Sequence, residues 1–142
     1  MAHPFYAEQG RFNEHGLNKL LGIEVTRFEN GSSQALVKIT ESVLGLPVGS
    51  AHTGVHGGVI ATLVDVGMSA ALVSLMKDDE LARTVQLQIN YLSAAQSGVL
   101  VCESKVIQKG RKIATVESEV LNDGKIVAKT TGIYYLSKVK EG

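Results

Sequence analysis

The chain has 142 residues, which is enough for one domain with a single hydrophobic core, and we expect residues 1–142 to form that domain. Apolar residues make up 44% of the chain and charged residues 20%, a globular composition that excludes a disordered protein. The 14 Lys and Arg residues balance the 14 Asp and Glu residues, so no overall charge attracts nucleic acid or a membrane surface. The one cysteine, Cys102, excludes an intrachain disulfide. With no visible signal peptide, this predicts a cytoplasmic protein.

The first part of the chain predicts one helix and two strands. Residues 12–21 carry apolar side chains at helical spacing, and Gly22 follows as a stop signal. Residues 23–28 and 34–39 predict two strands on either side of a tight turn. Residues 41–55 follow no consistent period, so we expect a loop there.

One long helix is predicted over residues 57–77, and it is apolar on nearly every side. Such a helix must be covered by other parts of the structure on nearly every side. After it the period changes to two: residues 84–92 predict a strand with Val85 and Leu87 on its apolar face and Thr84 on the opposite, polar face.

Three more strands are predicted over residues 99–108, 113–121 and 125–136, joined by short hairpin turns. Hairpins impose antiparallel pairing, and a single helix that is apolar all round needs a sheet that curls around it. The chain is therefore predicted to be an α+β protein, with a curved antiparallel sheet wrapped around one long central helix.

The chemistry is concentrated where this helix begins, at His56, Gly57 and Gly58, and at one carboxylate within it, Asp65. A helix N-terminus presents free N–H groups and partial positive charge, and glycine lets a substrate carbonyl approach the backbone closely. Such a helix end can stabilise the charge that grows on a thioester oxygen during attack. Asp65 would cost several kcal/mol to bury in this apolar helix unless it were paired.

Helix geometry constrains how Gly57 and Asp65 can act together. They are eight residues apart, so their backbones are separated by roughly 12 Å along the helix axis. One carbonyl cannot contact both groups within a single subunit. If both act on the same bond, Asp65 comes from a second subunit whose helix runs antiparallel, which predicts a two-fold dimer with its sites at the interface.

This stretch resembles the hotdog-fold acyl-CoA thioesterases of the PaaI-like, phenylacetate-pathway type, in the 4-hydroxybenzoyl-CoA thioesterase superfamily. The family pattern has His-Gly-Gly and an acidic residue nine positions after the histidine, which His56 and Asp65 match. The likeness extends through residues 21–25, 88–95 and 106–120 and so covers nearly the whole chain. It implies the hotdog fold and hydrolysis of a small aromatic or fatty acyl-CoA. It also implies a homodimer or a dimer of dimers and no cofactor beyond the coenzyme A of the substrate.

The resemblance also implies a role for each site residue. The N–H of Gly57 would polarise the thioester carbonyl, and Asp65 of the opposing subunit would act as general base or as nucleophile. His56 would orient the loop or the thioester, and Thr84 would position Asp65 or the water. The family commonly has Asn six residues before the histidine, where this chain has Ser50. We therefore also consider a contribution from the neighbouring residues 52–53.

A basic cluster and two other functions complete the predictions. Lys109, Arg111 and Lys112 lie on one hairpin, where they would bind the phosphates of coenzyme A or simply form a solvated edge. The four histidines and Cys102 show no metal-ligand spacing, so no metal is expected. The alternatives to hydrolysis are a hotdog dehydratase or hydratase acting on acyl thioesters, and a non-catalytic acyl-CoA-binding protein.

Overall fold

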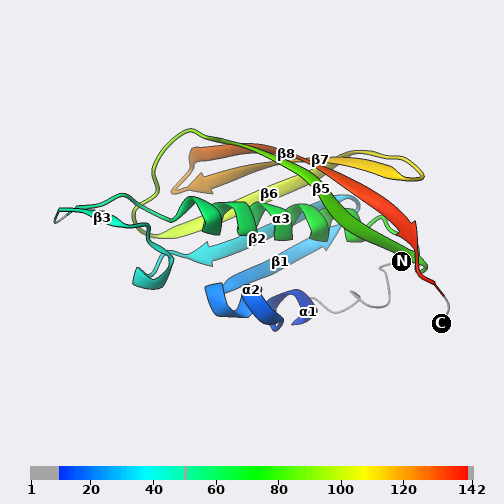
Figure 1. Cartoon of the computed structure of the whole chain (residues 1–142), viewed down its shortest axis with the longest axis horizontal. Coiled ribbons are helices and arrows are strands. Elements are labelled where there is room, and N and C mark those ends of the chain that lie inside the picture. Colours follow the sequence, from blue (N-terminus) through cyan, green and yellow to red (C-terminus); the bar gives the residue numbers. More distant parts are fainter. Residues whose placement is uncertain (1–9, 50, 141–142) are drawn as a thin grey trace.

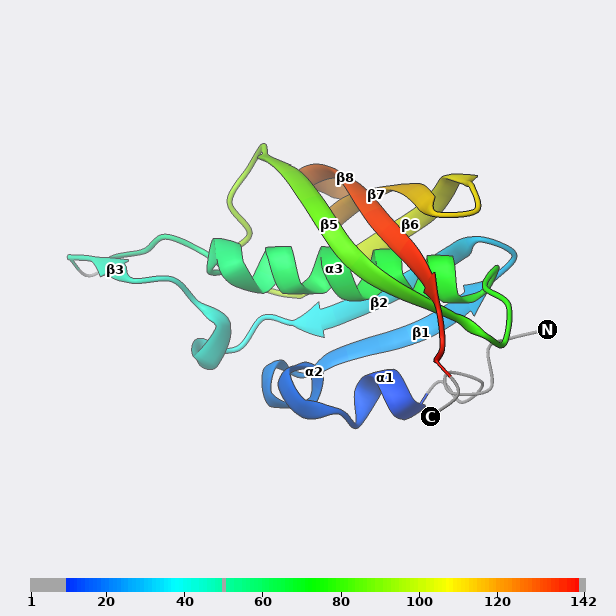
Figure 2. The same cartoon turned by 45° about the vertical axis from the view of Figure 1, so that its right-hand side comes forward.

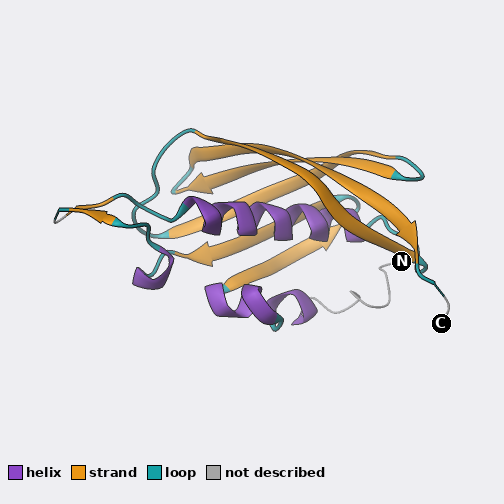
Figure 3. Cartoon of the chain, in the orientation of Figure 1, coloured by secondary structure: helices purple, strands orange, loops and turns teal. Residues whose placement is uncertain are grey.

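A computed structural model describes residues 10–49 and 51–140 of the chain. Its helices are α1 (Gly10–Asn13), α2 (Gly16–Leu21) and α3 (Gly57–Val73), with a 3-10 helix, η2, at Glu41–Val43. Its strands are β1 (Ile23–Glu29), β2 (Ser32–Lys38), β3 (Pro47–Val48), β4 (Ala51–His52), β5 (Glu80–Tyr91), β6 (Val99–Lys109), β7 (Ile113–Asn122) and β8 (Lys125–Lys138). The predicted α+β architecture is confirmed, because a six-stranded antiparallel sheet curves around the long helix α3 (Figures 1 and 3).

The strand order of the sheet determines which side of α3 stays open. The order is β1-β2-β6-β7-β8-β5, and every neighbouring pair is antiparallel. Strand β5 follows α3 directly and crosses the front of the molecule to pair with β8 at the edge of the sheet (Figure 2). Its other edge pairs with no strand among the described residues.

The core lies between α3 and the concave face of the sheet. Leu63, Met68 and Leu72 of the helix are fully buried there, and burying a side chain of this size stabilises the fold by about 1.5–3 kcal/mol. Ala61, Asp65 and Ser69 share the remaining stripe of the helix and are only half-buried. The expectation that the sheet covers α3 on nearly every side is therefore only partly met within one chain.

Helix α3 ends four residues earlier than the predicted residue 77. The amides of Leu75 and Met76 bond to carbonyls three residues back, so the last turn tightens and the helix stops. The hydroxyl of Ser74 donates to the carbonyl of Ala71 at 2.6 Å and accepts the amide of Gly31 at 2.8 Å. This serine ties the helix end to the β1–β2 turn.

The predicted helix over residues 12–21 is instead two short helices. The side chain of Asn13 turns out of the first one to pair with edge strand β1, and its Oδ1 accepts the amide of Val25 at 2.7 Å. Gly16 follows with a φ of +44°, in the left-handed region. The hydrogen bond between Asn13 and Val25 thus outweighs the helical propensity of the sequence at this break.

A β-bulge changes the predicted faces of β5. Thr84 pairs with Tyr134 and Gln86 pairs with Ile133, so Val85 is an extra residue in the ladder. The prediction that Val85 faces the core is wrong, because its side chain is 62% exposed. Thr84 pairs with Tyr134 and Leu87 pairs with Gly132, two positions away on β8. Thr84 and Leu87 therefore lie on the same face of the sheet.

The segment 41–55 is not a plain loop, because it contains η2 and the short hairpin β3–β4, which projects beyond the N-terminal end of α3 (Figure 1). Gly54 anchors its return to the body of the protein. The φ of Gly54 is +96°, and its carbonyl accepts the amide of Gly45 at 2.8 Å. The next amide, that of Val55, donates to the carbonyl of Ala95 at 2.8 Å.

We expect Gly54→Ala to lower the free energy of unfolding by about 2 kcal/mol or more, since strain and steric overlap add. A Cβ there would lie 2.8 Å from the carbonyl oxygen of Ala95 and would keep the unfavourable φ. Gly124→Ala is the matched control, because its φ is +79° but nothing lies within 4 Å of the added Cβ. Urea unfolding of both variants measures the difference, and equal losses would contradict the steric account.

Candidate active site

The N-terminus of α3 is capped by His56. The amide of Gly58 donates to Nδ1 of this histidine at 2.8 Å, so the neutral ring carries its proton on Nε2. A Cβ on Gly58 would lie 2.9 Å from that Nδ1, which explains why the second position of the Gly-Gly pair has no side chain. The capped ring is exposed and presents its Nε2–H to the surroundings.

Gly57 leaves a backbone donor unused at the tip of the helix. Its N–H has no hydrogen-bond partner among the described residues, as expected for the first turn of a helix. Its carbonyl accepts the hydroxyl of Tyr91, at the end of β5, at 2.8 Å. A cavity of about 400 Å³ opens beside it, lined among others by Val55, Ile60 and Leu92. A free donor thus borders a largely apolar cavity.

Two hydroxyls converge on the carboxylate of Asp65. Thr84 Oγ1 donates to Oδ1 at 2.8 Å, and the hydroxyl of Tyr134 donates to the same oxygen at 2.9 Å. The β5 bulge brings Thr84 to this face, so the structure places the threonine beside the carboxylate. Sequence reasoning missed Tyr134, although alternation along residues 125–136 turns its side chain inward. Asp65 is thus a hydrogen-bonded carboxylate on the open stripe of α3.

The free amide and the carboxylate do not meet within one subunit. Gly57 and Asp65 both belong to the continuous helix α3, so about 12 Å of helix rise separates them. The side chains that hold Asp65 come from β5 and β8, whereas the cavity beside Gly57 lies at the end of β5. One chain therefore holds the free amide and the hydrogen-bonded carboxylate in two separate places.

The remaining predicted site residues lie in the loop before α3, and the structure describes only part of that loop. Ser50 lies outside the described residues, so its role stays a prediction. Thr53 donates its hydroxyl to the carbonyl of Leu46 at 3.2 Å, which makes it a structural residue of the projecting hairpin.

The basic hairpin divides into one structural lysine and two free cations. Lys109 Nζ lies 3.0 Å from Oε2 of the buried Glu80 and is largely buried itself. Arg111 and Lys112 are exposed, form no ion pair with a described residue, and border a cavity of about 560 Å³ with Lys138. The hairpin between β6 and β7 lies at the end of the molecule where α3 finishes, opposite to Gly57 (Figures 1 and 2).

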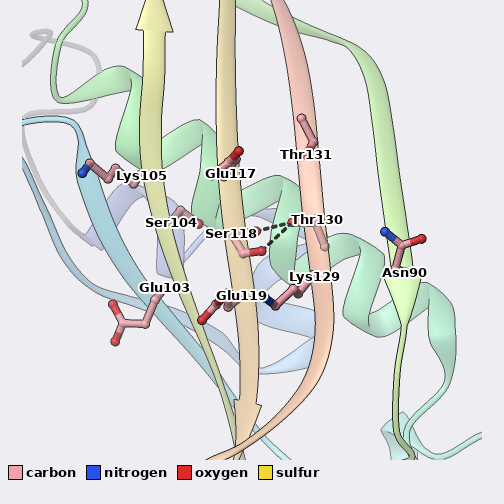
Figure 4. Close-up of a pocket in the computed structure, with 10 residues that line it drawn as sticks. All are labelled: Asn90, Glu103, Ser104, Lys105, Glu117, Ser118, Glu119, Lys129, Thr130 and Thr131. Atoms are coloured by element: carbon pink, nitrogen blue, oxygen red, sulfur yellow. Dashed lines mark hydrogen bonds and ion pairs between the residues drawn. The ribbon is translucent and has the colours of Figure 1, made fainter.

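A further depression, on the outer face of the sheet, is separate from both Gly57 and Asp65. The depression has a volume of about 450 Å³ and is bordered by Glu103, Glu119 and Lys129 (Figure 4). Ser118 and Thr130 also border it, but their side chains are buried and hydrogen bond to each other. Two of its carboxylates are paired: Lys129 Nζ lies 3.6 Å from Glu119, and Arg27 Nη2 lies 3.4 Å from Glu103. Neither Gly57 nor Asp65 borders it.

The single cysteine and possible metal ligands do not add a further reactive site among the described residues. Cys102 is fully buried, and burial raises the pKa of its thiol to about 11, so it packs as a small apolar residue. Among residues 10–49 and 51–140, no cluster of His, Cys, Asp and Glu side chains is arranged to hold a metal. In the same ranges, no helix has the length and apolar character needed to cross a bilayer.

Comparison with known proteins identifies the family. The model of the thioesterase superfamily matches residues 52–129, which contain α3 and strands β5, β6 and β7. The chain belongs to the thioesterase superfamily. A protein of Saccharolobus solfataricus, named "Putative esterase SSO2140", is 30% identical over 125 residues, covering 86% of this thioesterase and 84% of the relative. The chain is therefore a thioester hydrolase.

Solved structures confirm the hotdog fold of this thioesterase. Thioesterase HI1161 of Haemophilus influenzae superposes with a TM-score of 0.82 at 18% identity, covering 92% of this chain and 89% of that one. A mutant of the phenylacetic acid degradation protein PaaI of Thermus thermophilus superposes with a TM-score of 0.72 at 23% identity. The match covers 82% of this chain and 95% of that one. The fold expected from the PaaI-like resemblance is thus confirmed.

Substitutions at His56 separate its cap from any role in turnover. We expect His56→Ala to lose about 1 kcal/mol of stability with the cap, and His56→Asn to retain that stability, because Asn caps well. We expect both variants to lose turnover, since neither places a donor where Nε2–H now lies. Thermal unfolding and release of free thiol measure the two effects. Wild-type turnover by His56→Asn would mean that the histidine is only a cap.

Proposed function

We propose that the chain hydrolyses an acyl-coenzyme A thioester at a site shared by two copies of itself. The observation that carries this proposal is the separation of the free Gly57 amide from the hydroxyl-bound Asp65 carboxylate along one rigid helix. Each group is half of what thioester hydrolysis needs, namely an oxyanion donor and a base or nucleophile. A second, antiparallel copy of α3 supplies the missing half to each.

The open edge of the sheet supports this dimer. Strand β5 exposes a row of unpaired backbone groups, together with large side chains such as Val85 and Tyr91, which are 62% and 52% exposed. Antiparallel pairing of two β5 strands would continue the sheet across a two-fold axis and bring the half-buried stripes of the two α3 helices together. A further dimer of dimers stays a prediction.

In the proposed reaction, the Gly57 amide donates to the thioester oxygen while charge develops on it. Asp65 of the other subunit either takes a proton from the water that attacks the carbonyl carbon, or attacks that carbon itself and forms an anhydride that water then cleaves. In both routes a C–O bond forms, the C–S bond breaks and the thiolate takes up a proton. The products are the free acid and coenzyme A, and the apolar cavity beside Gly57 suits a small aromatic or fatty acyl group.

The basic hairpin is proposed to bind the phosphates of the substrate. Because the hairpin lies where α3 ends, it is remote from Gly57 of its own subunit (Figure 2). In the proposed antiparallel dimer, each site combines Asp65 of one subunit with Gly57 of the other. The hairpin of the subunit that contributes Asp65 then lies beside that site. Arg111 and Lys112 are the available cations, since Lys109 neutralises Glu80.

The activity is tested with purified protein and a panel of aromatic, short-chain and long-chain acyl-CoAs, with free thiol as the readout. Turnover of at least one acyl-CoA that Asp65→Asn abolishes, with dimerisation intact, supports the proposal. An enoyl-CoA in the same panel reveals hydration as a loss of ultraviolet absorbance without thiol release. Tight binding with no thiol release would leave only the acyl-CoA-binding alternative.

Mixing two inactive variants tests whether the site is shared. We expect Gly57→Pro and Asp65→Asn to be inactive alone, and an equal mixture that has exchanged subunits to recover about a quarter of the wild-type rate, because half the dimers are mixed and each has one intact site. Proline at 57 removes the N–H yet suits the first helical position, and the ψ of 130° at His56 tolerates a following proline. Gly57→Ala, which keeps the N–H, is the control. A mixture that stays inactive after exchange would place both groups in one subunit.

The phosphate contact is tested by charge removal. We expect the double variant Arg111→Ala and Lys112→Ala to raise KM for acyl-CoA about tenfold, with kcat unchanged and with no effect on an acyl-pantetheine that lacks the nucleotide. Lys125→Ala, which removes an exposed cation elsewhere, is the control. An equal rise in KM for both substrates would rule out phosphate recognition.

A further inference from the structure

Tyr134 is a core residue whose hydroxyl hydrogen bonds to the carboxylate of Asp65. Its side chain lies on the inner face of β8 and is 1% exposed, in a layer of otherwise mostly apolar side chains. Its hydroxyl nevertheless reaches the open stripe of α3, where it lies 2.9 Å from Oδ1 of Asp65. A buried phenol usually needs such a partner, but this partner is the proposed reactive carboxylate.

The strand that carries Tyr134 makes room for its ring. Gly132 is two positions earlier on the same face, and a Cβ there would lie 3.0 Å from Cε2 of Tyr134 and 2.5 Å from Sδ of Met68. Thr84 is the cross-strand neighbour of Tyr134 in the β5–β8 ladder. The two hydroxyls therefore arise side by side from adjacent strands and point at the same oxygen.

The two hydrogen bonds leave the carboxylate asymmetric. Both hydroxyls donate to Oδ1, and no described residue donates to Oδ2. We propose that Tyr134 is a positioning residue that, together with Thr84, holds Oδ1 of Asp65, so that Oδ2 is the oxygen that acts on the water or the thioester. The inference rests on the proposed function of Asp65 and deepens it.

A buried tyrosine is well suited to this task. Burial, reinforced by the neighbouring Asp65 carboxylate, raises the pKa of Tyr134 above its usual range, so the hydroxyl keeps its proton and remains a donor. Two donors on one oxygen restrict rotation of the carboxylate, and a misplacement of about 1 Å in a reacting group can cost about 100-fold in rate.

The test compares two neighbouring tyrosines. We expect Tyr134→Phe to lower kcat for the best acyl-CoA about tenfold or more, with KM changed less than about twofold, because an interaction with the reacting carboxylate is lost while substrate binding is kept. Tyr135→Phe is the matched control, since Tyr135 faces outward, is 41% exposed and makes no contact with Asp65. We expect this control to retain wild-type kcat, and only kcat is compared, because Tyr135 borders the same cavity as Arg111 and Lys112. Thermal unfolding establishes that both variants are folded.

Thr84 supplies the second arm of the test. We expect Thr84→Val to lower kcat and Thr84→Ser to restore it, and we expect the double variant with Tyr134→Phe to depart from additivity, because both hydroxyls act on one oxygen. If Tyr134→Phe does not fold, the Thr84 pair carries the test, because Thr84→Val removes the other hydroxyl that donates to Oδ1 and Thr84→Ser keeps it.

The outcomes separate this inference from the proposed function. A folded Tyr134→Phe with wild-type kcat, alongside an inactive Asp65→Asn, overturns the positioning role and leaves the function standing. An active Asp65→Asn overturns the function itself and the positioning role with it. A fall in stability with kcat unchanged would make Tyr134 a packing residue only.

Discussion

The fixed rise of helix α3 is the constraint on which the rest of this thioesterase depends. A helix cannot bend its first amide toward a side chain two turns later, so the Gly57 donor and the Asp65 carboxylate stay about 12 Å apart. Chemistry that uses both therefore needs a second helix. The half-buried stripe around Asp65 and the unpaired edge of β5 lie on the side of α3 where that second copy is proposed to dock.

The sheet does more than cover the helix, because it also orients the carboxylate. Strands β5 and β8 are neighbours, and the bulge at Val85 turns Thr84 inward beside Tyr134. Without the bulge, the alternation of β5 would place Thr84 on the outer face, and Asp65 would have one donor fewer. A local irregularity of one strand thus determines the hydrogen bonding of a residue on another element.

The two ends of α3 have opposite character. At its beginning lie a free amide, a histidine cap and an apolar cavity, which suit the acyl half of a thioester. At its end lies the hairpin with Arg111 and Lys112, which suits a phosphorylated carrier. In the proposed antiparallel dimer, these two ends would match a substrate with an apolar group at one end and several negative charges at the other.

The sequence by itself determined the fold class and the extent of the long helix to within about one turn, because the hydrophobic period is a local property. Residue spacing also marked His56, Gly57 and Asp65 as candidate site residues. Sequence reasoning misplaced Val85, merged α1 with α2 and missed Tyr134. A bulge appears only when two strands are paired, the Asn13 bond to β1 competes with helix formation, and convergence on Asp65 depends on which strands become neighbours. These features belong to contacts between distant segments, and only the tertiary structure decides them.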